Sequence, residues 1–154
     1  MATVEKRDRV RELDGVPLPD PGAPDPLLLA DEDTLVVAYR SANDATSLVV
    51  FQQCYASHFG PPNDDAFASH PLADRGLRAY GAFEVENSTW LRGLEARNRG
   101  HPRHDPQLFQ RLRHWVWTFH DTVLECAALS HAAEDAPGRP ADLLSRMQAL
   151  VRAR

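Results

Sequence analysis

Short apolar runs separated by polar turns predict three strands in the N-terminal half of the chain. Residues 27–30 and 34–39 are rich in Leu, Val and Tyr, and the acidic turn 31–33 separates them, which is typical of a β-hairpin. A turn of small polar residues follows at 41–44. Residues 47–55 (SLVVFQQCY) then return with the β-branched and aromatic residues that favour strands. We therefore expect a three-stranded antiparallel unit.

The next segment predicts a departure from the sheet and a later return to it. Residues 58–62 (HFGPP) contain two consecutive prolines and a glycine, which favour neither a strand nor a helix. Asn63 can cap a short helix, which should end near His70 because Pro71 disfavours α geometry before it. Residues 82–86 (AFEVE) alternate like a short strand.

Helical spacing and capping residues predict three helices in the second half of the chain. The first covers residues 89–98, with cap residues at its start and Gly100 after its end. The second opens at Asp105 with a proline directly after it. Residues 132–140 are predicted as a polar loop, and residues 141–154 as a terminal helix with a narrow apolar stripe. We expect this stripe to pack on the sheet or on a partner, which leaves a homo-oligomer open.

Residues 113–129 carry two conflicting patterns. One set of apolar residues recurs at helical spacing: Leu108, Leu112, Trp115, Phe119, Val123 and Cys126. However, three aromatic residues alternate at Trp115, Trp117 and Phe119, and in a strand they would all face one core. We favour a helix to about residue 112, followed by a hairpin that turns at His120-Asp121.

Length and composition predict one domain of the α+β class. The 154 residues suffice for a single core that folds without disulfides or a structural metal. Residues 14–26 hold five prolines and two glycines among acidic residues, so residues 1–26 are predicted to be a flexible, proline-rich acidic arm. The domain, residues 27–154, should contain a mainly antiparallel sheet of about five to six strands. Helices are expected on one face of this sheet, together with a C-terminal helix.

Charge and hydropathy restrict the classes of partner. With 17 Lys and Arg against 22 Asp and Glu, the formal net charge is −5, which gives no general attraction for nucleic acid or anionic lipid. No stretch approaches the ~20 apolar residues of a membrane span, and residues 1–11 lack the apolar run of a secretory signal. We expect no nucleic-acid or membrane partner and a cytoplasmic location. Cys54 and Cys126 form no CxxC pair, and we interpret both as small buried hydrophobic residues.

No nucleotide-binding, hydrolase or metalloprotease motif occurs in the chain. The segment 119–125 (FHDTVLE) is the best catalytic candidate, because His120 lies near the carboxylates of Asp121 and Glu125. In the hairpin interpretation, Glu125 lies across from Val116, with His114 and Thr118 as its diagonal neighbours. In the helix interpretation, Asp121 and Glu125 would instead share one face with His114, a spacing more suggestive of metal or acid–base chemistry.

Two further segments are candidates for ligand binding. The loop 58–65 presents His58 and Asn63 on a backbone constrained by glycine and proline. Glu84, Asn87 and Trp90 lie where a strand changes into a helix. Turn, cap and core roles explain the same residues without any ligand. The seven histidines are scattered without a recognised ligand spacing, so we assign no metal ligands and identify no cofactor.

Two hypotheses of function follow. The first is a binding or regulatory module for a small polar ligand or a partner protein, favoured by the missing motifs. The second is a small enzyme in which His120 is the acid–base group, Glu125 or Asp121 orients it and His58 approaches from its loop, with or without a metal ion. The enzyme hypothesis requires His58, His120 and Glu125 to converge in one cleft.

Overall fold

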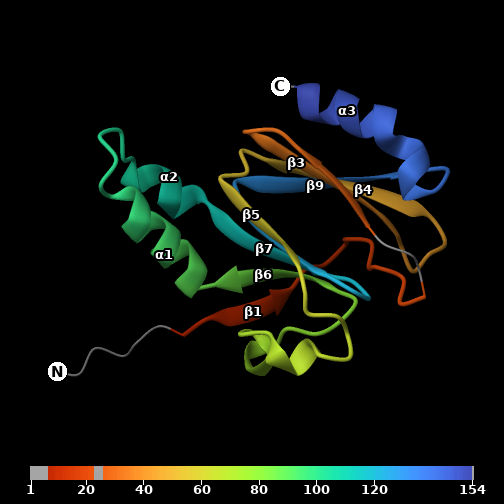
Figure 1. Cartoon of the computed structure of the whole chain (residues 1–154), viewed down its shortest axis with the longest axis horizontal. Coiled ribbons are helices and arrows are strands. Elements are labelled where there is room, and N and C mark those ends of the chain that lie inside the picture. Colours follow the sequence, from red (N-terminus) through yellow and green to blue (C-terminus); the bar gives the residue numbers. More distant parts are fainter. Residues whose placement is uncertain (1–6, 23–25, 154) are drawn as a thin grey trace.

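The computed structural model describes residues 7–22 and 26–153, and it contains two antiparallel sheets (Figure 1). The five-stranded sheet has the order β1 (Arg9–Glu12), β6 (Ala82–Glu86), β7 (Arg113–Thr118), β8 (Val123–Ala128) and β5 (Ala56–Gly60). The four-stranded sheet has the order β2 (Leu27–Ala30), β3 (Thr34–Arg40), β4 (Thr46–Gln52) and β9 (Ser130–Ala136).

The two sheets pack face to face around an aromatic core. Trp115, Trp117 and Phe119 all belong to the buried cluster between the sheets, which confirms that they share one face of a strand. The indole of Trp117 donates a hydrogen bond to the Tyr39 hydroxyl at 3.1 Å and meets the Phe51 ring edge-on at a centroid distance of 5.1 Å. The hairpin of β7 and β8 turns at residues 119–122, as alternation predicts.

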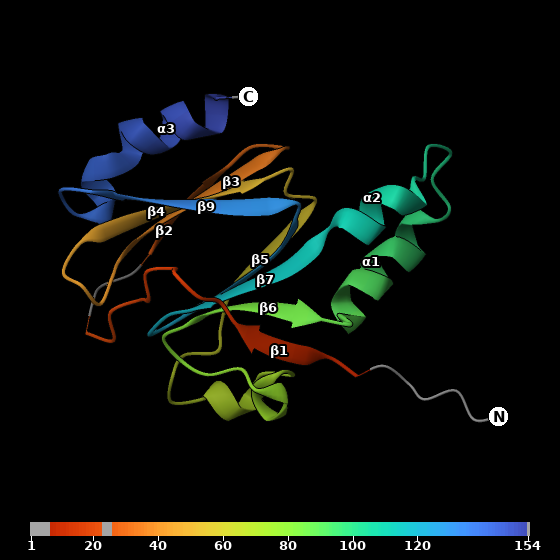
Figure 2. The ribbon, with the colours of Figure 1, turned by 180° about the vertical axis from the view of Figure 1, so that it is seen from behind.

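Helices cover the outer face of each sheet, and the two views agree on their placement (Figures 1 and 2). Helix α3 (Leu144–Arg152), preceded by the 3₁₀ turn η3 (Pro140–Leu143), packs on the four-stranded sheet through Met147 and Val151. Helices α1 (Thr89–Asn98) and α2 (Pro106–Arg111) pack on the five-stranded sheet through Leu94 and Phe109. Two further 3₁₀ turns, η1 (Phe67–Ser69) and η2 (Ala73–Arg75), lie between β5 and β6 in the chain.

Capping residues begin α1 and α2 at the positions that the sequence predicts. Ser88 Oγ accepts a hydrogen bond from the Leu91 N–H at 3.1 Å, and Asp105 Oδ1 accepts one from the Gln107 N–H at 2.9 Å. Pro106 is the first residue of α2, where its missing N–H leaves no donor unsatisfied. Both helices therefore start where local side chains satisfy their backbone donors.

The mixed α and β composition, the antiparallel strands and the C-terminal helix are confirmed. The arrangement differs from the expectation of one sheet of about five to six strands with helices on one face. Two sheets are present, and helices pack on both. Alternation along a strand shows which residues face a core, but it does not show which strands share a sheet.

Two edge strands lie where the sequence predicts loops. Residues 130–136 (SHAAEDA) form β9, which pairs with β4, and β5 includes residues from the predicted loop 58–62. Both strands have side chains that are mostly exposed or partly exposed, so their sequences lack a regular apolar pattern. Backbone hydrogen bonds to one neighbouring strand define them instead.

The N-terminal segment also differs from the expected flexible arm. Within residues 7–22, β1 pairs with β6 in the register Val10 to Val85, and the Leu13 N–H donates to the Ala82 carbonyl at 2.9 Å. The Pro17 carbonyl accepts a hydrogen bond from the Tyr39 hydroxyl at 2.6 Å. These contacts join the segment to both sheets. Residues 1–6 and 23–25 of the predicted arm lie outside the described residues.

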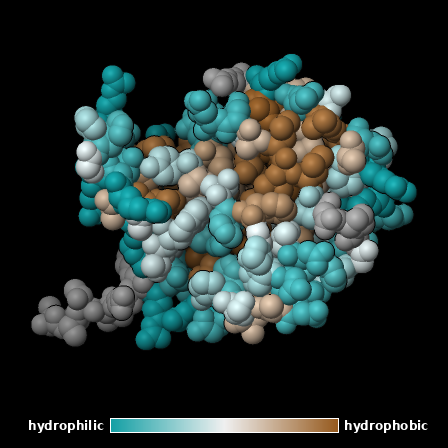
Figure 3. Space-filling model, viewed as in Figure 1, coloured by the Kyte–Doolittle hydropathy of each residue, from teal (hydrophilic) through white to brown (hydrophobic). Residues whose placement is uncertain are grey.

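Hydrophobic residues gather on one part of the face shown in Figure 3, over the region of the four-stranded sheet and α3. Most of the remaining surface in this view is hydrophilic. None of the helices in the described part of the chain is long and apolar enough to cross a membrane.

Candidate functional site

The candidate site is centred on Glu125, which points to the outer face of the five-stranded sheet. Along β8, the outward positions are Val123, Glu125 and Ala127. Val123 belongs to the apolar cluster under η1 and η2, and Ala127 belongs to the cluster under α1 and α2. Glu125 therefore lies between two apolar clusters that cover the same face of the sheet.

Two histidines hold the carboxylate of Glu125. His114 Nε2, on the neighbouring strand β7, is 2.8 Å from Glu125 Oε1. His70 Nε2, from the segment that follows η1, is 3.2 Å from Glu125 Oε2. The Glu125 side chain is 19% exposed, so the carboxylate is largely removed from water. Each of its oxygens accepts a hydrogen bond from one imidazole.

The backbone fixes the tautomer of His70. The Leu72 N–H donates a hydrogen bond to His70 Nδ1 at 3.0 Å, so this nitrogen carries no proton. The proton of the neutral ring is therefore on Nε2, where it is donated to Glu125. A protonated Nε2 has no lone pair for a metal ion.

Ser88 orients His114 in the same way. Ser88 Oγ accepts the Leu91 N–H and lies 2.7 Å from His114 Nδ1. Because the ionised Glu125 carboxylate can only accept, the contact at Nε2 places the proton of the neutral ring on that nitrogen, and Nδ1 then accepts the Ser88 hydroxyl proton. Both side chains are buried, with residue exposures of 6% for Ser88 and 2% for His114. The cap of α1 is thus also the hydrogen-bond partner that holds the His114 ring in place.

These hydrogen bonds determine the charge of Glu125. Burial alone would raise its pKa, because a carboxylate is less stable away from water. The hydrogen bonds from His114 and His70, together with the electrostatic effect of the two rings, outweigh burial and lower the pKa of Glu125 from 4.5 to about 2. Glu125 is therefore ionised at neutral pH.

A cavity of about 440 Å³ opens beside this carboxylate. Its lining residues come from β5, the segment 61–71, α1 and β8: His58, Pro61, Pro62, Ser69, His70, Pro71, Trp90 and Glu125. A neighbouring cavity of about 290 Å³ shares four of them and extends to Asp8, Leu72, Thr89 and His114. The Trp90 ring lies against His114 at a centroid distance of 4.8 Å. The site thus combines a charged group with aromatic and proline walls.

The comparisons with known proteins give no relative. No protein family model matches the chain, and no curated protein or solved structure shows a significant match.

The ladder of β5 and β8 explains why His58 is part of the site. His58 lies directly opposite Glu125 in this antiparallel pair, so both side chains point to the same face of the sheet. Within the described residues, the His58 imidazole has no hydrogen-bond or ion-pair partner. It is therefore the imidazole at the cavity whose two nitrogens remain free for a ligand.

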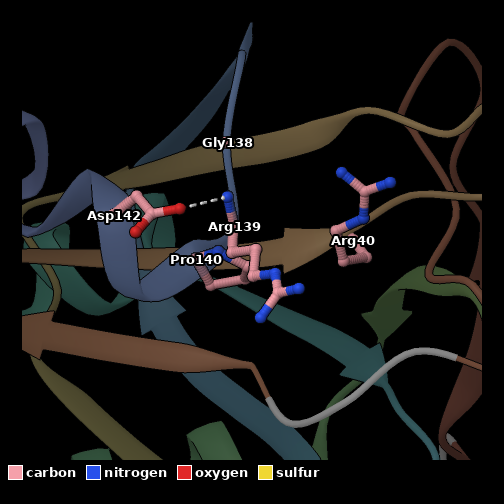
Figure 4. Close-up of a pocket in the computed structure, with 5 residues that line it drawn as sticks. All are labelled: Arg40, Gly138, Arg139, Pro140 and Asp142. Carbon is pink, nitrogen blue, oxygen red and sulfur yellow. Dashed lines mark hydrogen bonds between the residues drawn. The ribbon is translucent and has the colours of Figure 1, made fainter.

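A larger cavity of about 700 Å³ lies elsewhere, between the end of β3 and the start of η3. Figure 4 shows its lining residues, Arg40, Gly138, Arg139, Pro140 and Asp142. The Asp142 carboxylate accepts a hydrogen bond from the Arg139 N–H at 3.0 Å, and Arg40 pairs with Asp44 at 2.6 Å. In Figure 4 the two guanidinium groups point away from each other. They do not converge on a shared ligand position. We therefore regard the two cavities that Glu125 lines, of about 440 and 290 Å³, as the candidate site and call them the Glu125 cavities.

The other predicted catalytic residues, His120 and Asp121, occupy the turn between β7 and β8. His120 Nδ1 lies 3.1 Å from Asp64 Oδ2 and 3.0 Å from the Tyr80 hydroxyl. The Tyr80 hydroxyl also donates to Asp64, which lowers the pKa of Asp64 and raises the pKa of Tyr80 to about 12. Neither His120 nor Asp121 lines the Glu125 cavities. The structure thus brings His58 and Glu125 together and places His120 in a separate surface cluster.

The predicted ligand-binding residues also lie in different parts of the structure. Trp90 and His58 line the cavity. Asn63 Oδ1 instead accepts a hydrogen bond from the Ala66 N–H at 2.9 Å, which is a turn interaction. Asn87, with a positive φ of 55°, precedes the cap of α1 and lines neither cavity.

Glu84 lies on the opposite, inner face of the five-stranded sheet. It is directly across from Trp115 in the pair of β6 and β7. Its buried carboxylate is 3.1 Å from Arg11 Nη2 and 3.0 Å from Arg113 Nη1. These ion pairs join β1, β6 and β7 and take no part in the Glu125 cavities.

Sequence reasoning missed His70 and the joint role of Ser88 and His114. His70 precedes a proline in a loop, and nothing local shows that the loop folds back over β8. Ser88 was recognisable only as a helix cap. For His114 a signal existed, because alternation places it on the same face as Val116, opposite the tryptophans.

Across residues 7–22 and 26–153, no three His, Cys, Asp or Glu side chains form a group suited to a metal ion.

Proposed function

We propose that this domain is a binding module for a small polar ligand, and that the ligand is held in the Glu125 cavity. The observation that carries the proposal is an ionised carboxylate, fixed by two imidazole donors, beside a cavity with an aromatic wall. Ligand sites are typically concave, largely apolar and supplied with a few well-placed polar groups. The cavity volume lies in the range of such sites.

The carboxylate of Glu125 retains capacity to bind a ligand. Its two oxygens offer about four acceptor positions, and His70 and His114 use two of them. The imidazoles are in turn fixed by the Leu72 N–H and by Ser88. Groups held in this way need little reordering when a ligand binds, which favours affinity.

Binding is favoured over the catalytic hypothesis by the position of His120. An acid–base group must reach the substrate, and His120 lies outside both Glu125 cavities. His70 and His114 each use both ring nitrogens in hydrogen bonds, which suits them to positioning the carboxylate. We therefore propose a small polar ligand as the partner of this site.

The test is a fragment screen followed through the indole N–H signal of Trp90 in ¹H–¹⁵N NMR spectra, assigned with Trp90→Phe. We expect a subset of polar fragments to shift this signal, and Glu125→Gln to weaken their binding. Glu134→Gln is the matched control, because Glu134 is a carboxylate on β9 that pairs with Arg146 at 2.8 Å. A screen in which no fragment shifts the Trp90 signal would refute the proposal.

A further inference from the structure

We infer that the ligand of the Glu125 cavity carries an alkylammonium group, so that the site selects small organic cations. This inference rests on the proposed function and names the chemical class of its ligand. It is carried by the charges that line the two adjoining cavities and by the aromatic wall between them.

The lining of the two cavities is negatively charged. Glu125 lines both, and Asp8 lines the smaller one, where its carboxylate accepts a hydrogen bond from the Thr89 N–H at 2.6 Å. No Lys or Arg of the described chain lines either cavity. A ligand carboxylate or phosphate would therefore meet like charges without a compensating cation.

The imidazoles beside Glu125 stabilise its charge without cancelling it. His70 is neutral, because its Nδ1 accepts the Leu72 N–H and only Nε2 carries a proton. His114 has the same form, because its Nε2 faces the acceptor-only carboxylate of Glu125 and its Nδ1 is hydrogen-bonded to the Ser88 hydroxyl. The network therefore keeps one net negative charge at the edge of the cavity. A partly desolvated, uncompensated carboxylate attracts a cation more strongly than an exposed one.

Trp90 supplies the second element of a cation site. An ammonium group over the face of a tryptophan ring is attracted by the negative face of the ring, and desolvation strengthens this attraction. Apolar walls near Trp90 in the 440 Å³ cavity come from Pro61, Pro62 and Pro71. These walls suit the alkyl substituents of an organic ammonium ion better than a hydrated inorganic cation.

Two matched pairs of probes separate charge from shape. Choline is compared with 3,3-dimethyl-1-butanol, its neutral isostere, and n-butylammonium with n-butanol. Each is titrated into the full chain while the indole signal of Trp90 is followed. We expect each cation to bind at least about tenfold more tightly than its neutral counterpart, in line with hydrogen bonds and ion pairs to charged groups. The preferred pair distinguishes a quaternary from a primary ammonium ligand.

Variants locate the binding. Glu125→Gln should remove most of the preference for the cation over its neutral counterpart, and Glu134→Gln should leave that preference and both affinities unchanged. Trp90→Leu should weaken the binding of both cations; because this variant lacks the reporter indole, its binding is measured by isothermal titration calorimetry. Asp8→Asn keeps the test usable if Glu125→Gln lowers stability too far, and it should weaken the cations by a smaller factor. Two results would overturn the cation inference but leave the binding site intact. The first is equal binding of a cation and its neutral counterpart, and the second is a shift of the Trp90 indole signal by anionic fragments alone. If no compound of any charge shifts Trp90, the proposed function fails as well.

Discussion

His70 and Glu125 lie 55 positions apart in the sequence, and a 3.2 Å hydrogen bond joins His70 Nε2 to Glu125 Oε2. This contact attaches the segment 61–71 to the outer face of β8. The same segment provides the proline walls of the 440 Å³ cavity that Glu125 lines. The shape of the site therefore depends on His70, which also shares with His114 the stabilisation of the charged carboxylate.

His70→Ala should lower the free energy of unfolding by roughly 2–4 kcal/mol, because it leaves the Leu72 N–H without an acceptor and removes a donor from a buried carboxylate. Urea denaturation followed by circular dichroism measures this change. His120→Ala is the control. His120 is half exposed, and its partners Asp64 and Tyr80 are only partly buried, so its loss should cost less than about 1 kcal/mol. Equal costs for the two variants would show that the His70 hydrogen bonds contribute no special stability.

The pKa of Glu125 predicts the direction of a pH effect. Its folded-state pKa of about 2 lies below the ordinary value of 4.5, so the ionised carboxylate stabilises the folded state at pH values above 4.5. This contribution, at most about 3 kcal/mol, should be lost as the pH falls from about 4.5 to 2. Unfolding free energies of the wild type and Glu125→Gln, measured across this range, isolate the effect. A constant difference between the two proteins would contradict the prediction.

The sequence predicts part of this site because some of it is local. Alternation along 113–128 places Glu125 across from Val116, and the structure confirms this register. The three aromatic residues at alternate positions likewise identify the core face of β7. These predictions succeed because a strand with one buried face specifies its own register.

The remainder of the site depends on contacts between distant segments. The His70 contact requires a loop to fold over β8, and no pattern within the loop records that tertiary contact. Strand β9 is built from alanine and polar residues, so its pairing with β4 leaves no apolar period in the sequence. The division into two sheets similarly depends on which strands pair, which local spacing does not encode.

The N-terminal segment gives a prediction opposite to that from its composition. Prolines and charges suggest a dispensable arm, but β1 pairs with β6, and Leu13 and Val16 pack against the core. Deleting residues 1–22 should therefore lower the melting temperature by an amount comparable to the loss of a sheet strand. The double variant Val10→Ser and Leu13→Ser should lower it in the same direction, because it removes apolar contacts while retaining the chain. Calorimetry measures both. An unchanged melting temperature would restore the arm interpretation.

His58 should matter to ligand binding more than to stability. Its side chain is exposed, has no partner among the described residues and lies across from Glu125 at the cavity. His58→Ala should therefore change the free energy of unfolding by less than about 0.5 kcal/mol, because no buried group loses a hydrogen bond. It should weaken choline binding by about two- to tenfold, which corresponds to one net hydrogen bond or a comparable wall contact.

Phe59→Ala is the matched control, since Phe59 is the next residue on β5, is 41% exposed and points to the opposite face of the sheet. The two variants change the same edge strand, and only one of them changes the cavity. If Phe59→Ala weakens choline binding as much as His58→Ala does, the effect arises from β5 as a whole, and His58 is not a ligand contact.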